Sequence, residues 1–233
     1  MRVAACIAVA LLGVCTSRVA AQATPSGGRT RVEGVAAVVG SGERVLSVLR
    51  SDVTLRARLL LAGRASRLPV GPLPPALLST TLETLIGEAL IAREADRLRA
   101  GEPSDEDVDA ERQALVAAAG GEARLSALLT RLGVEDEELT AIAVRRAYVQ
   151  SFLRVNLEGS TVVSDVQVQR VYESGEHPFG ERPLEAIREV LRRWIASESL
   201  QRDVARWVQV LRSRTPVRIV AEWGSEGRDR AAQ

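Results

Sequence analysis

The chain has 233 residues, of which 46% are hydrophobic, and its 31 basic residues, all of them arginine, nearly balance 30 acidic residues. The net charge of only +1 gives no overall basic excess, so we expect no polybasic patch that draws the protein to nucleic acid or anionic lipid. This length suffices for a sizeable core without disulfides, as one elongated domain or two small ones.

Residues 1–21 have the three parts of a cleavable secretory signal peptide: basic Arg2, an apolar run over residues 3–14, and small residues near the end. The apolar run is too short to span a bilayer. Cleavage fits after Ala21 or after Ala23, and we favour Ala21. We therefore expect an exported protein that has no stable membrane insertion once the signal peptide is removed.

Both cysteines, Cys6 and Cys15, lie inside this segment. The remaining chain then has no thiol for a disulfide, a metal ligand or a nucleophile. A lipoprotein signal that modifies Cys15 is the alternative, but Val14 stands before it where Gly, Ala or Ser is expected. The sequence leaves lipidation of Cys15 open.

The next segments predict a leader and a small β element. Residues 22–31 consist mainly of Thr, Pro, Ser, Gly and Arg, which is typical of a flexible leader, and order is expected from Val32. Residues 35–39 predict a strand, and the Gly-Ser-Gly sequence at 40–42 predicts a tight turn. Residues 45–49 then predict a second apolar strand or the approach to a helix.

Nearly all of the chain beyond this point is predicted to be helical. Ser51 can cap a helix that ends at residue 61 or 62 before Gly63, and the Pro-rich residues 68–75 then interrupt the helical pattern. Apolar periodicity and end signals, including Gly101, Ser104 and Pro183, place six further helices at about 75–99, 104–119, 125–132, 136–156, 164–172 and 183–215.

The end of the chain predicts a strand that returns to the start. Residues 217–223 alternate after Pro216, and residues 224–233 form a polar tail that we expect to be disordered. An isolated strand would leave its hydrogen-bonding groups unmatched. We therefore predict that residues 35–39 pair with residues 217–221.

No constellation of residues points to catalysis. His177 is the only histidine, and we interpret it as a solvated loop residue. Acidic pairs such as Glu88 with Glu94 fit the wet faces of helices, and the acids at 105–107 fit a helix N-terminus. The glycines at 40–42 lack the rest of a phosphate-binding loop. The sequence predicts no catalytic residue, no metal ligand and no cofactor.

Two apolar features allow a core or a surface interpretation. The longest predicted helix carries an apolar stripe about 45 Å long that includes Trp194 and Trp207. We interpret the stripe as core, with an exposed partner-binding surface as the alternative. Leu59, Leu60 and Leu61 cover most of a helix circumference, so at least one of them is expected to point away from a one-sided core.

The order of these elements resembles the N-terminal chaperone module of SurA-type periplasmic chaperones and their parvulin-associated relatives, over nearly all of the exported sequence. The most recognisable piece is the Ser-Asp-Glu-x-Val-Asp step at residues 104–109. Five further segments resemble family elements in the same order: residues 35–45, 82–95, 128–139, 163–172 and 184–219.

The resemblance implies a mostly α fold over residues 32–223, with a long C-terminal helix and a small β element that joins the two ends. Relatives usually carry a parvulin isomerase domain before the closing helix, whereas residues 173–182 form only a short loop here. One histidine cannot supply the histidine-lined proline pocket of parvulins. The resemblance therefore implies a periplasmic holdase without isomerase activity, which binds unfolded outer-membrane or secreted polypeptides.

A non-catalytic adaptor or assembly subunit, with one fixed partner in the envelope, is the alternative function. For the holdase, we place part of the client-binding surface at Leu59, Leu60, Leu61, Val70 and Leu73. The first three lie together on the helix that begins near Ser51, and the other two lie among prolines that hold the following segment extended. These apolar residues exceed what one helix face can bury.

Overall fold

The computed structural model describes residues 34–42, 45–157 and 162–224. The predicted signal peptide at 1–21 and leader at 22–31 lie outside the described residues. So does the predicted tail, apart from Gly224, which belongs to a final 3-10 turn.

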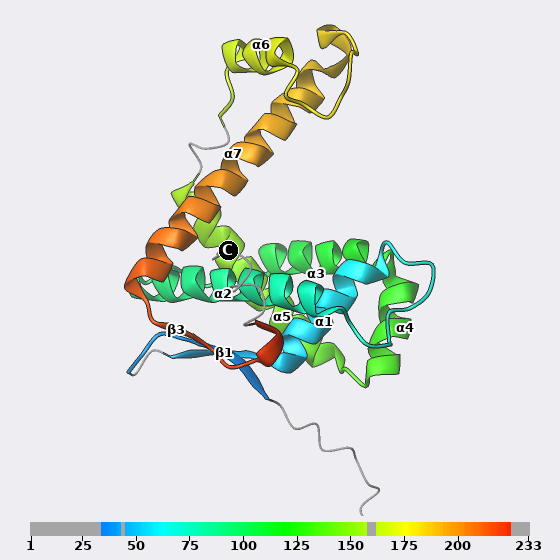
Figure 1. The fold of residues 1–233 in the computed structure, drawn as a ribbon, viewed down its shortest axis with the longest axis vertical. Coiled ribbons are helices and arrows are strands. Elements are labelled where there is room, and N and C mark those ends of the chain that lie inside the picture. The colour runs from blue at the N-terminus through cyan, green and yellow to red at the C-terminus, as the bar shows by residue number, and fades with distance from the viewer. Residues whose placement is uncertain (1–33, 43–44, 158–161, 225–233) are drawn as a thin grey trace, which may run out of the picture. The chain divides into compact units, whose positions relative to one another are not determined.

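The described residues are mostly helical, as predicted, with seven α-helices and a small three-stranded antiparallel sheet (Figure 1). The helices are α1 (Arg50–Ala62), α2 (Pro75–Arg97), α3 (Asp105–Ala119), α4 (Glu122–Leu132), α5 (Asp136–Asn156), α6 (Asp165–Ser174) and α7 (Leu184–Arg214). The strands are β1 (Val35–Val39), β2 (Leu46–Leu49) and β3 (Val217–Ile219), and the 3-10 turn η2 spans Glu222–Gly224.

Several predicted helix ends are confirmed by their capping geometry. The Ser104 hydroxyl accepts a hydrogen bond from the backbone N–H of Asp107 at 3.1 Å, which satisfies a free donor at the start of α3. Ser164 caps α6 in the same way. Gly120 and Gly133 end α3 and α4 in the left-handed conformation that glycine adopts without strain.

Three predicted helix signals are wrong. Ser51 does not cap α1, because β2 runs directly into the helix and the N–H of Arg50 donates to the carbonyl of Gly34 instead. Gly101 does not end α2, because Arg99 already leaves the helix with a positive φ of 56°. Pro183 is the N-cap of α7 rather than its first helical residue.

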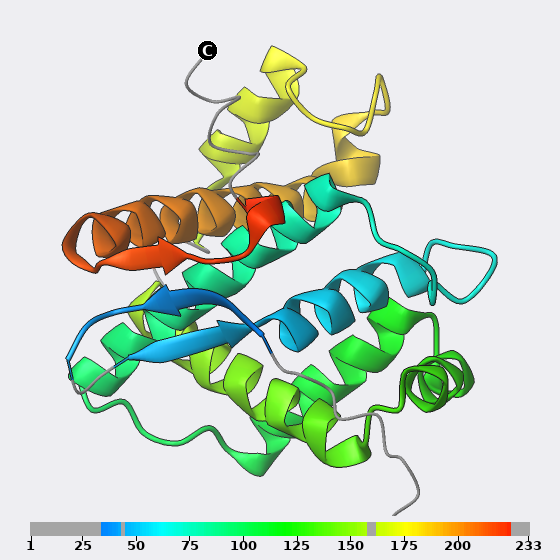
Figure 2. The same ribbon diagram turned by 60° about the horizontal axis from the view of Figure 1, so that its bottom comes forward.

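The predicted pairing of the two chain ends is confirmed. The strand order is β2-β1-β3, so β1 is the central strand and pairs antiparallel with both neighbours (Figure 2). Val38 lies opposite Arg218 in the ladder between β1 and β3. The N–H of Gly40 extends the ladder by donating to the carbonyl of Pro216 at 2.8 Å.

The apolar side chains of the described residues form three separate clusters. The first joins the sheet to α2, the C-terminal part of α5 and the C-terminal half of α7. The second joins α1, α3, α4 and the N-terminal part of α5. The third lies between α6 and the N-terminal half of α7. The apolar stripe of α7 therefore serves two different cores.

The chain after α1 is held by arginine side chains. The Nε of Arg124 in α4 donates to the carbonyl of Ala62 at 2.7 Å, at the C-terminus of α1. Nη1 of Arg58 donates to the carbonyls of Pro69 and Gly71 in the Pro-rich segment. The Arg124 bond satisfies a carbonyl of the last turn of α1, and the Arg58 bonds satisfy carbonyls of the Pro-rich segment that lie outside any helix or sheet.

Gly63 provides a stability test of the contact between α1 and α3. A Cβ atom at Gly63 would lie 2.3 Å from the backbone oxygen of Ala118, too close for either backbone to avoid moving. We expect Gly63→Ala to lower the free energy of unfolding by about 1–3 kcal/mol. At Gly71 no atom lies within 4 Å of an added Cβ. Gly71→Ala should leave the free energy of unfolding unchanged or raise it by up to about 1 kcal/mol. Both variants can be measured by urea denaturation. Equal losses of stability in the two variants would contradict the close contact between Gly63 and Ala118.

Candidate functional site

The five predicted client-binding residues do not form one surface. Leu59 is only 1% exposed and belongs to the second apolar cluster, because this position of α1 faces α3, α4 and α5. Leu59 is therefore excluded from any contact surface. Leu60 and Val70 are 45% and 43% exposed. Leu61 and Leu73 are half-buried.

The exposed positions of this group lie on a fixed backbone. Leu60 is the leucine that points away from the core, as the sequence predicted for at least one of the three. Val70 lies between two carbonyls, of Pro69 and Gly71, that both accept hydrogen bonds from Arg58. Leu60, Val70 and Leu73 belong to none of the three apolar clusters, so they can contact another molecule without disturbing a core.

A larger cavity that the sequence analysis did not identify opens between α2, α5 and α7. Its volume is about 770 Å³, and we call it the α2–α5–α7 groove. The buried side chains of Ile91, Val149 and Leu153 form its floor. Of the apolar side chains of α7 that line it, those at positions 200, 204 and 208 are half-buried and Ala205 is exposed. None of the five predicted residues lines it.

Gly87 in the middle of α2 leaves room for the groove. A Cβ atom at this position would lie 3.6 Å from both methyl groups of Val208, in ordinary contact, so the missing side chain is not required by a clash. Glycine inside a helix costs about 1 kcal/mol relative to alanine, which makes it an unfavourable choice on stability alone. A glycine inside a predicted helix was the one sequence signal that could have indicated this groove.

An aromatic contact fixes the distance between α5 and α7 next to the groove. The rings of Phe152 and Trp207 stack with centroids 5.4 Å apart. In the sequence, Phe152 directly precedes the groove residue Leu153, and Trp207 directly precedes the groove residue Val208. Aromatic stacking stabilises a contact beyond the burial of both rings, so this pair helps to hold α5 and α7 together beside the groove.

The charged residues that line the groove are already paired. Glu83 of α2 accepts a hydrogen bond from Arg212 of α7, and Arg154 donates to Asp107 at 2.9 Å. Glu88 pairs with Arg56 of α1 at 2.5 Å. The groove therefore presents no unpaired charge from these four lining residues.

Three amide side chains, of Gln150, Gln201 and Gln209, line the groove beside its apolar surface. An amide both donates and accepts hydrogen bonds, as a peptide group does. An apolar floor with neutral amides at its edge can hold an apolar polypeptide segment and satisfy part of its backbone. The same surface is poorly suited to a strongly charged ligand.

The pair of Arg56 and Glu88 connects the groove to the interior of the bundle. Arg56 is 7% exposed, and burial lowers the pKa of its guanidinium, although the charge of Glu88 opposes this shift. A second pair, Arg146 of α5 with Glu111 of α3 at 2.6 Å, adds to the charges around Arg56. Removing one partner of such a pair leaves a buried charge uncompensated.

This pair gives a second stability test. We expect Glu88→Gln to cost about 1–3 kcal/mol, because Arg56 loses a charged hydrogen-bond acceptor while side-chain size is kept. The matched control is Glu185→Gln, where the carboxylate is 82% exposed and pairs with Arg188 along α7. That exposed pair should contribute no more than about 1 kcal/mol. Equal effects in thermal unfolding would show that the Arg56 pair is not a buried interaction.

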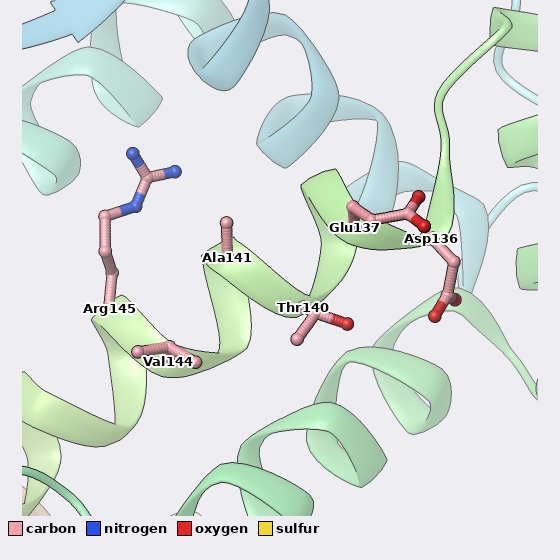
Figure 3. Close-up of a pocket in the computed structure, with 6 residues that line it drawn as sticks. All are labelled: Asp136, Glu137, Thr140, Ala141, Val144 and Arg145. Atoms are coloured by element: carbon pink, nitrogen blue, oxygen red, sulfur yellow. The ribbon is translucent and has the colours of Figure 1, made fainter.

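A second depression, of about 540 Å³, follows one face of α5 (Figure 3). All six residues that line it come from this single helix, with Asp136 and Arg145 at opposite ends. Both end charges are engaged elsewhere, Asp136 with Arg112 and Arg145 with Asp52. One helix face offers no opposing wall, so we do not treat this depression as the functional site.

His177 is not the solvated loop residue that the sequence predicted. It is half-buried, and its ring stacks on Tyr172 at a centroid distance of 5.6 Å. Its Nδ1 accepts a hydrogen bond from the N–H of Phe179 at 3.3 Å. The histidine therefore supports the loop between α6 and α7. Of the acids considered in the sequence, Glu88 and Glu94 are both paired with arginines.

Within residues 34–42, 45–157 and 162–224, no three His, Cys, Asp or Glu side chains are grouped so that they could hold a metal ion. None of the helices described is both long and apolar enough to cross a bilayer. Comparison of the sequence with models of known protein families and with curated proteins found no match.

Proposed function

We propose that the protein is a periplasmic holdase-type chaperone that binds unfolded outer-membrane or secreted polypeptides without catalysing a reaction. The observation that carries the proposal is the α2–α5–α7 groove, with its apolar floor, its paired charges and its neutral amides. The predicted signal peptide and the resemblance to SurA-type chaperone modules support the location and the class of client.

The groove has the size and the chemistry that polypeptide binding needs. Ligand sites are typically cavities of about 300–1,000 Å³ with apolar walls and few polar groups, and the groove volume of about 770 Å³ falls in this range. Burial of apolar surface is non-directional, so it does not select one client sequence. A holdase needs this tolerance, whereas an adaptor for one fixed partner needs specific polar contacts.

Exposed and half-buried residues of α1 and the Pro-rich segment form a second proposed contact region. Leu60, Val70 and Leu73 supply apolar surface there, with Leu61 half-buried beside Leu60. An unfolded polypeptide is long enough to contact more than one such region. Weak contacts at linked sites combine into a stronger overall affinity.

Leu200 gives the sharpest test of the groove. It lines the groove on α7, is half-buried, and belongs to none of the three apolar clusters. We expect Leu200→Asp to reduce severalfold the ability of the protein to slow aggregation of a denatured porin. The melting temperature should fall by less than about 4 °C, because no core contact is lost.

The matched control is Val210→Asp, at a 40% exposed position of α7 outside the groove. This variant should keep full antiaggregation activity. If both variants are as active as the unmodified protein, the groove is not the client site. If the unmodified protein does not slow aggregation but copurifies with one stoichiometric partner, the adaptor function is correct. Acceleration of prolyl-peptide isomerisation above buffer would contradict the absence of catalysis.

The second contact region has its own test. Leu60→Ser and Leu73→Ser should weaken antiaggregation activity with a change in stability of no more than about 0.5–1 kcal/mol, because neither side chain belongs to a core cluster. Leu59→Ser is the contrasting variant, since Leu59 is buried. It should lower the melting temperature by several degrees. Unchanged activity in the first two variants would remove this region from the client surface.

A further inference from the structure

A smaller cavity of about 390 Å³ lies where α2 and α7 end, and we call it the arginine pocket. Three arginines line it, Arg93 and Arg97 from α2 and Arg214 from the last turn of α7. Glu94 is the one acidic residue of the lining. Leu90, Leu211 and Thr215 complete it.

Only one of the three arginines is neutralised by an acid within the pocket. Arg97 makes two hydrogen bonds to the carboxylate of Glu94, at 2.7 and 2.8 Å. The hydrogen bond from Arg97 lowers the pKa of Glu94, and the charge of Arg214 adds to this effect. Three guanidinium groups and one carboxylate leave the lining with two uncompensated positive charges.

Arg93 is the least satisfied of these groups. Its Nη1 is buried and has no hydrogen-bond partner, and the described part of the chain supplies none to its other nitrogens. Two other arginines have a buried nitrogen without a partner, Arg58 and Arg192, but both donate hydrogen bonds through their remaining nitrogens. A buried charged donor without an acceptor is costly.

The polarity of the two helices explains why arginines gather at this pocket, but it does not explain why Arg93 lacks a hydrogen-bond partner. The C-terminal ends of helices carry partial negative charge and favour basic residues nearby, and both α2 and α7 end at this pocket. If the arginines served only these ends, Arg93 would be expected to donate to a free carbonyl, and it does not. The missing partner of Arg93 is therefore an acceptor that is not one of the described residues.

We propose that the arginine pocket binds a small oxyanion with two negative charges, such as inorganic phosphate or an organic dicarboxylate. A dianion matches the two uncompensated charges, and oxygen acceptors match the planar donor geometry of guanidinium groups. Bound between Arg93 and Arg214, the dianion connects α2 to α7, as Glu83 and Arg212 do further along the same helices. This site is independent of the proposed chaperone function.

Isothermal titration calorimetry on the protein tests the site directly. Titrations with sodium phosphate and with succinate identify which dianion binds, and acetate and chloride at matched ionic strength serve as controls for charge screening. We expect saturable binding of at least one dianion. Arg93→Gln and Arg214→Gln should each weaken the affinity by about tenfold or more, because a charged hydrogen bond is lost. The control Arg193→Gln removes an exposed arginine of α7 outside the pocket and should leave the affinity unchanged.

A stability measurement keeps the test decisive if Arg93→Gln does not fold. Arg214 is exposed, so Arg214→Gln should fold normally. The melting temperature of the unmodified protein should rise with dianion concentration, because only the folded state binds. This rise should be lost in Arg214→Gln and kept in Arg193→Gln. The proposal is overturned if neither dianion binds saturably, or if Arg214→Gln binds and is stabilised like the unmodified protein.

Discussion

The antiparallel pairing of β1 with β3 fixes the position of the last helix. β1 is the central strand, so the returning end of the chain completes a sheet that would otherwise have an open edge along β1. Only Thr215 and Pro216 separate α7 from β3, and the carbonyl of Pro216 accepts the hydrogen bond from Gly40. The C-terminal half of α7 is therefore placed against α2. Both the groove and the arginine pocket use this half of α7 as a wall.

The length of α7 explains why a groove exists. The helix has 31 residues, more than either of its two cores covers. Ile195 is the last residue of the cluster formed with α6, and Val204 is the first α7 residue that packs on the cluster containing the sheet. Leu200 falls between them and joins neither. The apolar stripe continues across this gap, so Leu200 lines the groove without packing into either core, whereas Val204 and Val208 line the groove and also pack on the cluster that contains the sheet.

Local signals in the sequence were sufficient to predict the helices and the closing strand. A serine at Ser104 or a glycine at Gly120 acts on the backbone within one turn, so its effect is visible without the fold. The prediction that Ser51 caps α1 was wrong because the N–H of Arg50 donates to the carbonyl of Gly34, just before β1, and no local pattern shows this contact. The difference between buried Leu59 and exposed Leu60 is one step of 100° around α1, and it depends on where α3, α4 and α5 lie.

The groove and the arginine pocket join residues of α2 to residues of α7 that are more than 100 positions later in the sequence. No local sequence pattern could therefore predict either cavity.

The exposure of the groove residues bears on the proposed holdase function. A large exposed apolar patch invites aggregation, but here the floor is buried and the larger apolar side chains of α7 in the groove, at positions 200, 204 and 208, are half-buried. Ion pairs at Glu83 and Arg154 flank this surface and keep charged groups beside it. The apolar area left for a client is therefore limited, and each Å² removed from water contributes only about 25 cal/mol. Contacts of this size favour reversible binding, which the proposed chaperone function requires because a client must leave again to fold.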